Sequence, residues 1–181
     1  YKYLNDMWKF DLKNMEWTWM KGSSGLNAAS SYGTKGVSSA VNDPGARMIY
    51  AKWKDDKGNF WLFGGSQTFF GGHLNDMWKF DPNTSSATYN QWTWMNGNNT
   101  TESPGVYGII CAPSAKDVPS GKRESRACWK DNCGNFWLFG GSKKYADDNM
   151  KNDLWKYDPI SNKWTWINGS NAQNQSGTYG S

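Results

Sequence analysis

The chain has 181 residues, of which 17% are aromatic and 20% are charged, and its formal net charge is +4. Its 13 Trp, 9 Tyr and 8 Phe exclude an intrinsically disordered chain, because disordered segments contain few aromatic residues. No window approaches 18 apolar residues, which argues against a membrane-spanning helix, and the basic residues are scattered, which argues against a nucleic-acid-binding surface.

Short runs of alternating apolar and polar residues predict β-strands along the whole chain. Residues 1–21 contain two such runs, and no stretch has the apolar spacing of an amphipathic helix, so the expected fold is all-β. The next four strands are expected at residues 47–55, 60–63, 76–81 and 91–95. The Gly and Asn residues at 56–59 suit a tight hairpin between the first two of these strands.

These strands belong to a tandem repeat with a period of roughly 70–77 residues. Residues 4–11 (LNDMWKFD) return unchanged as 74–81, and residues 58–66 (GNFWLFGGS) return unchanged as 134–142. Every Trp falls in one of five equivalent positions, namely Trp8/Trp78/Trp155, Trp17/Trp92/Trp164, Trp19/Trp94/Trp166, Trp53/Trp129 and Trp61/Trp137. A small sheet with aromatic residues on both faces must stack against its neighbours, and radial stacking of four-stranded antiparallel sheets gives a β-propeller.

In each full repeat a double Gly follows an apolar strand, and an aromatic residue and a Trp then stand seven positions apart, as in Phe10 and Trp17 or Tyr157 and Trp164. In this pattern the repeat resembles the kelch family. The copy with Phe80 and Trp92 departs from this spacing by a five-residue insertion. The resemblance covers essentially the whole chain and is strongest to the long bacterial kelch repeats and the central domain of galactose oxidase. It implies a propeller, usually of six or seven blades, that presents loops for binding.

The predicted strands make up about two and a half blades of such a propeller. Residues 1–21 supply a half blade with strands three and four. Residues 22–97 and 98–169 each supply a long loop and a full blade, and residues 170–181 begin the next loop. Six or seven blades would need roughly 450–520 residues at this period, given the usual blade number. We therefore expect either part of a longer chain or a protomer that neighbours complete.

The long loops are the expected binding face. Ordered loops near 25 residues are uncommon and usually functional, and they should emerge on the same face as the loops that follow the double Gly. The alternative is that these loops merely cover the ends of the blades. The candidate binding residues on this face are Tyr32, Tyr107, Phe69, Phe70, His73 and Tyr145.

Catalytic, metal and cofactor sites are not expected. A copper site of the galactose-oxidase kind needs more than one imidazole, and His73 is the chain's one histidine, interpreted as a solvated loop residue. The repeated Asn-Asp pairs (Asn5-Asp6, Asn75-Asp76, Asn152-Asp153) are interpreted as caps of the turn entering the third strand rather than calcium ligands. Arg47 and Arg123, six residues before equivalent Trp residues, are expected to pair with a carboxylate or carbonyl inside each blade.

The pairing of Cys111, Cys128 and Cys133 stays open at this point, because an odd number leaves at least one thiol free or bonded outside the chain. The leading hypothesis is a non-catalytic scaffold or binding module, secreted or displayed on a cell surface, that binds protein, glycan or copies of itself. The alternative is the non-catalytic part of a carbohydrate-active or oxidase enzyme whose active site lies outside this segment. No cofactor, nucleic acid or membrane span is expected.

Overall fold

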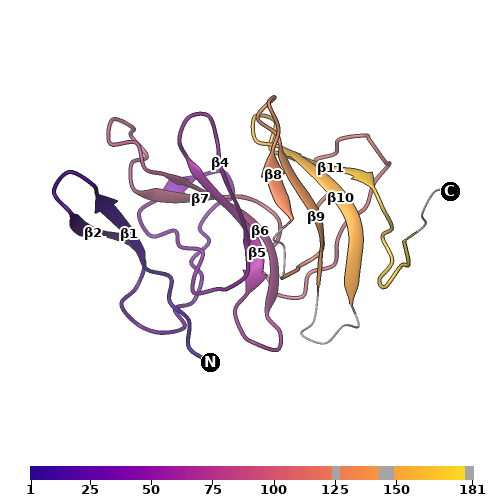
Figure 1. Cartoon of the computed structure of the whole chain (residues 1–181), viewed down its shortest axis with the longest axis horizontal. Coiled ribbons are helices and arrows are strands. Elements are labelled where there is room, and N and C mark those ends of the chain that lie inside the picture. Colours follow the sequence, from indigo (N-terminus) through magenta and orange to yellow (C-terminus); the bar gives the residue numbers. More distant parts are fainter. Residues whose placement is uncertain (124–126, 143–148, 178–181) are drawn as a thin grey trace.

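The computed structural model describes residues 1–123, 127–142 and 149–177, and these residues form three antiparallel β-sheets. The sheets follow one another along the molecule in chain order (Figure 1). Within the described ranges, no helix is long and apolar enough to cross a membrane. The all-β prediction is therefore confirmed.

The first sheet is a two-stranded hairpin of β1 (Met7–Asp11) and β2 (Glu16–Lys21). The middle sheet has the strand order β3-β7-β6-β5-β4 and the third sheet the order β11-β10-β9-β8. The middle strands are β3 (Ser38–Ser39), β4 (Ala51–Lys54), β5 (Phe60–Ser66), β6 (His73–Asp81) and β7 (Gln91–Asn96). The third-sheet strands are β8 (Cys128–Lys130), β9 (Phe136–Ser142), β10 (Met150–Asp158) and β11 (Lys163–Asn168).

The middle sheet has one strand more than the sequence predicts. In β3, Ser38 and Ser39 pair with Thr93 and Trp92 of β7, and the hydroxyls of Ser38 and Thr93 lie 2.6 Å apart. A strand of two serines has no alternation of apolar and polar residues, so the sequence pattern gives no sign of it. The third strand is also longer than expected, because β6 begins at His73 and not at residue 76.

The hairpin turns form as their sequence predicts, and an aspartate organises each of them. The Asp55 carboxylate accepts hydrogen bonds from the backbone N–H groups of Lys57 and Asn59 and from the Trp61 indole. Gly58 has a φ of +88°, which favours glycine. Asp131 repeats this arrangement in the third sheet.

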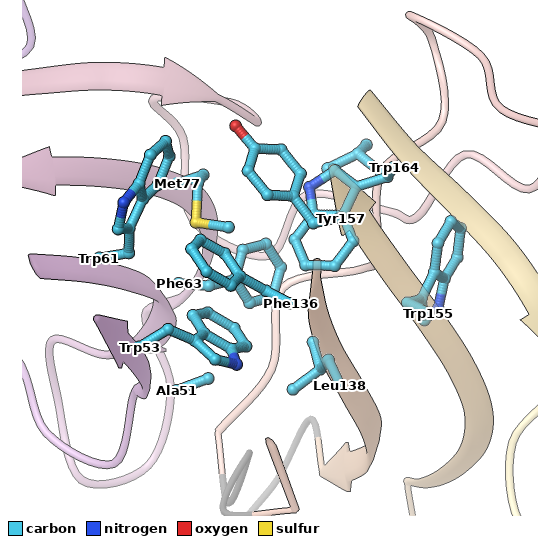
Figure 2. Close-up of a cluster of buried hydrophobic side chains, with 11 residues drawn as sticks. Ala51, Trp53, Trp61, Phe63, Met77, Phe136, Leu138, Trp155, Tyr157 and Trp164 are labelled. Carbon is cyan, nitrogen blue, oxygen red and sulfur yellow. The ribbon is translucent and has the colours of Figure 1, made fainter. Parts of the chain in front are cut away.

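The main hydrophobic core lies between the middle and third sheets (Figure 2). Trp53 of β4 stacks on Phe136 of β9 with the ring centres 5.3 Å apart, and Phe63 of β5 meets Trp164 of β11 edge to face at 5.0 Å. Large aromatic side chains dominate the free energy of burial in such a core. These two sheets therefore stack through the aromatic residues that the repeat places in register.

Candidate functional site

A buried ion pair joins each long loop to the sheet that follows it. Arg47 and Asp76 lie 2.7 Å apart with side chains 2% and 0% exposed. Arg47 also donates to the Gly64 and Pro44 carbonyls. Burial alone would lower the pKa of Arg47, yet the adjacent Asp76 carboxylate raises it above its ordinary value. The predicted structural role of Arg47 is confirmed.

Lys122, and not Arg123, holds the matching position in the third sheet. Lys122 Nζ lies 2.9 Å from Asp153 Oδ1, with both side chains fully buried. Burial tends to raise the pKa of Asp153, but Lys122 and hydrogen bonds from Trp155 and Tyr107 lower it overall, and burial lowers the pKa of Lys122.

The predicted equivalence of Arg47 and Arg123 is wrong, because the backbone register differs from the spacing to the next Trp. Met48 bridges Ser66, whereas Arg123 bridges Ser142, so Arg123 aligns with Met48. The third sheet therefore has one more residue before its Trp129. Arg123 instead donates to the Phe69 carbonyl at 2.7 Å and lies over the Phe69 ring.

Tyr32 and Tyr107, predicted as binding residues, are partly buried and hydrogen-bonded to aspartates of the sheets. The Tyr32 hydroxyl donates to Asp76 at 2.8 Å, and its ring packs on Trp78 and Trp94. Tyr107 makes the same contacts with Asp153, Trp155 and Trp166. Burial, and then the neighbouring aspartate charge, raises the pKa of both phenols above their usual range. These tyrosines attach the loops to the sheets.

The Asn-Asp pairs also act at a different place from the one predicted. Asn75 and Asp76 lie within β6, so they cannot cap its entry. The Asn75 side-chain oxygen accepts from the backbone N–H of Asn98, just after β7. Asn5 and Asn152 hold the corresponding N–H groups of Ser23 and Ser170. Each asparagine therefore fixes the chain as it leaves the last strand of its sheet.

His73 is not a solvated loop residue. It is the first residue of β6 and only 1% exposed, and its Nδ1 lies 2.7 Å from Glu102. The strand begins earlier than predicted, since His73 pairs with Ser66 across the sheet, and this pairing brings the imidazole into the interior. Within the described ranges, no group of three or more His, Cys, Asp or Glu side chains could hold a metal ion.

Phe69 and Phe70 lie beside a hollow, as a binding face would require. Tyr1 stacks on Phe69 with ring centres 4.1 Å apart, and Phe70 meets Phe69 edge to face. Tyr1, Tyr3, Ala28, Gln67, Phe69 and Phe70 are among the residues lining this hollow of about 620 Å³. Tyr145, the last predicted binding residue, lies outside the described residues.

A second hollow, which the sequence does not indicate, runs between the first hairpin and the middle sheet. It is a groove of about 610 Å³, with residues 4–8 on one side and β4 and β5 on the other. Lys52, Lys54, Phe60 and Leu62 line the wall that the middle sheet contributes. Among the described residues, β1 pairs with β2 alone, so the edge of β1 facing this groove has no strand beside it.

The groove exposes aromatic side chains that are buried elsewhere in the molecule. Phe60 is 40% exposed, whereas Phe136, its counterpart in an identical segment, is fully buried. Trp8 is 50% exposed, whereas its counterparts Trp78 and Trp155 are fully buried. Because the exposed and the buried segments have the same sequence, their residue patterns cannot predict the groove. The feature of the sequence that does indicate it is the number of strands predicted for the first sheet, which is two.

All three cysteines are free thiols, with Cys111 and Cys133 exposed and Cys128 partly buried. Cys128 faces Leu138 across the third sheet, so no bridge to Cys133 forms at the hairpin. This outcome resolves the pairing that the sequence left open.

No family model matches the chain, and no curated protein is significantly similar to it.

Proposed function

We propose that this chain is a non-catalytic scaffold of kelch-type propeller blades that binds protein surfaces through its open end. The open end comprises the exposed aromatic residues of the first hairpin, Trp8, Trp17 and Trp19, together with the adjoining groove. This proposal rests mainly on one observation: Trp8 and Trp17 are exposed, whereas their counterparts in the other two sheets are buried. The counterparts of Trp19 are partly buried.

The repeat supports the assignment to propeller blades. The strand pairs β6–β7 and β10–β11 have the same register, with the same register shift between their first and second residue pairs, and β1–β2 repeats it. The middle sheet packs face to face on the third sheet through one aromatic core. Successive copies of one sheet, stacked in this way along the chain, are the arrangement from which propellers are built.

The contacts of the charged side chains and of two tyrosines support a non-catalytic role. Arg47, Lys122, Asp76 and Asp153 are all committed to buried pairs that hold loops to sheets. Tyr32 and Tyr107 are committed to the same two aspartates. These groups stabilise the scaffold, and the surface left for a partner is aromatic.

The open end suits a protein partner for energetic reasons. Trp17 is 65% exposed and Trp19 is 51% exposed, and both lie on the short strand β2. Contiguous exposed apolar surface of this kind marks interaction sites, and Trp is enriched among residues that dominate binding energy. The partner class that fits is another aromatic β-sheet face, including one from a second copy of the chain.

Sedimentation velocity across low to high micromolar concentration tests this proposal. The wild-type chain should self-associate, and the double variant Trp17→Ser/Trp19→Ser should remain monomeric at about 20.5 kDa. Ile160→Ser is the matched control, because Ile160 is 94% exposed on a turn of the third sheet and should leave association unchanged. A wild-type chain that stays monomeric throughout, or a double variant that associates equally well, would contradict the proposal.

A further inference from the structure

Resting on that proposed function, we infer that the groove beside β1 is a receptor for a β-hairpin of the type formed by residues 51–66. Such a hairpin would add two strands to the edge of β1 and pack its aromatic face on the middle sheet. The juxtaposition that carries this inference is an unpaired strand edge next to an exposed aromatic wall.

The edge of β1 has the chemistry to accept that hairpin. Residues 4–11 have the same sequence as residues 74–81, which hold β5 in the middle sheet. There, Leu62 lies opposite Trp78 and Phe60 lies opposite Phe80. The same register at β1 would put the incoming Leu and Phe opposite Trp8 and Phe10. Strand addition to a free sheet edge is an established mode of peptide recognition.

The wall of the groove matches the aromatic face of the same hairpin. In the interface between the middle and third sheets, Trp53 of the hairpin stacks on Phe136, and its indole donates to the Trp129 carbonyl at 3.0 Å. Trp61 contacts the same Phe136 ring at 5.3 Å. In the groove, Phe60 stands where Phe136 stands, and it is exposed. An incoming hairpin would cover it with two Trp rings.

The charge of the groove also complements the charge of the hairpin turn. At the occupied interface, Lys130 of the third sheet forms an ion pair with Asp56, which lies in the turn of the β4–β5 hairpin. Lys54 takes the position of Lys130 in the middle sheet and lines the groove, with its ammonium group 6.0 Å from the Phe60 ring. The receptor therefore favours a hairpin with an acidic residue in its turn.

Glycine in the incoming strand is a steric requirement. Gly64 has a φ of +65°, and a Cβ there would lie 2.8 Å from the Leu74 carbonyl oxygen. The equivalent contact at β1 would be with the Leu4 carbonyl. Any larger residue at this position would push the strand away from the edge.

The test uses a synthetic peptide of residues 51–66 (AKWKDDKGNFWLFGGS), labelled at its N-terminus, and fluorescence anisotropy with the full chain. The peptide should bind saturably. The same peptide with Gly64→Val should bind at least about 10-fold more weakly, although its charge and aromatic content are unchanged. The peptide with Asp56→Lys should bind more weakly, and added salt should reduce that difference.

Two variants of the chain locate the site. Phe60→Ser removes the exposed wall of the groove and should weaken peptide binding about 10-fold or more. Ile160→Ser is the matched control, because Ile160 is 94% exposed on a turn of the third sheet and does not line the groove. It should leave the peptide affinity unchanged, and circular dichroism should show that both variants are folded.

Equal binding of the wild-type and Gly64→Val peptides would overturn the inference, as would a Phe60→Ser chain that binds normally. A peptide of residues 60–66 that binds as tightly as the hairpin would also overturn it, in favour of single-strand addition. Absence of peptide binding would overturn the hairpin receptor while leaving the proposed function intact, provided that the self-association sensitive to Trp17→Ser/Trp19→Ser persists. If that association also fails, the proposed function falls with it.

Discussion

The β1–β2 hairpin and the β6–β7 part of the middle sheet have nearly the same sequence and opposite environments. Residues 4–11 and 74–81 are identical, yet Trp8 is 50% exposed and Trp78 is fully buried. The difference arises outside the strands. β6 has β5 beside it and Tyr32 of a long loop against Trp78. Burial of these tryptophans is therefore a property of the assembled neighbours and not of the strand that carries them.

Truncating one Trp in each region should give the largest contrast. Trp78→Ala should lower the free energy of unfolding by about 3–5 kcal/mol, because it empties a fully buried site. Trp8→Ala should cost less than about 1 kcal/mol, because half of that side chain is already in water. Urea unfolding followed by circular dichroism measures both values. Equal losses would show that the first hairpin is covered in solution.

Replacing Asp76 of the middle sheet and Asp6 of the first hairpin by Asn gives a second comparison of the two regions. Asp76→Asn leaves Arg47 buried with its charge uncompensated, so a loss of about 3 kcal/mol is expected. Asp6 holds the same position in the first hairpin and, among the described residues, accepts a side-chain hydrogen bond from the Trp8 indole alone, at 2.7 Å. Asp6→Asn should therefore cost less than about 1 kcal/mol. Urea unfolding measures both losses of unfolding free energy. A larger loss for Asp6→Asn than for Asp76→Asn would contradict the assignment of Asp76 as the buried ion-pair partner of Arg47.

Low pH should reduce the free energy of unfolding through the hairpin turn of the third sheet, by less than the substitutions at Trp78 and Asp76. Hydrogen bonds from Trp137 and Asn135 lower the pKa of Asp131 from 3.8 to about 2. The unfolded chain then binds this proton more tightly than the folded chain. The stabilisation is present above about pH 4 and is lost as the pH falls toward 2. Unfolding free energies measured across this range should fall less steeply in Asp131→Asn, and an unchanged slope would contradict the assignment.

The sequence predicts the regular parts of this fold well, because strand alternation and the repeated motifs are local signals. The hairpin turn at residues 56–59 follows from its Gly and Asn, and the structural role of Arg47 follows from its place before a strand. Lys122 is missed because one additional residue before Trp129 shifts the spacing, and spacing was the only guide. β3 is missed because two serines carry no pattern.

The candidate site is less predictable than the fold. Tyr32 and Tyr107 recur in register, which fits a binding face and a loop attachment equally well, and their contacts with Asp76 and Asp153 become visible only in the structure. The groove beside β1 depends on which strands are neighbours in space. An exposed Phe60 and a buried Phe136 within identical segments cannot be told apart by residue type.

Hydroxyl-radical footprinting read by mass spectrometry tests the central claim most directly, because it measures the solvent exposure of each Trp in the intact chain. The account predicts that Trp8 and Trp17 are oxidised much faster than Trp78 and Trp92, and that the peptide of residues 51–66 slows the oxidation of Phe60. Equal oxidation of Trp8 and Trp78 would contradict the claim that the first hairpin is an open copy of a buried interface.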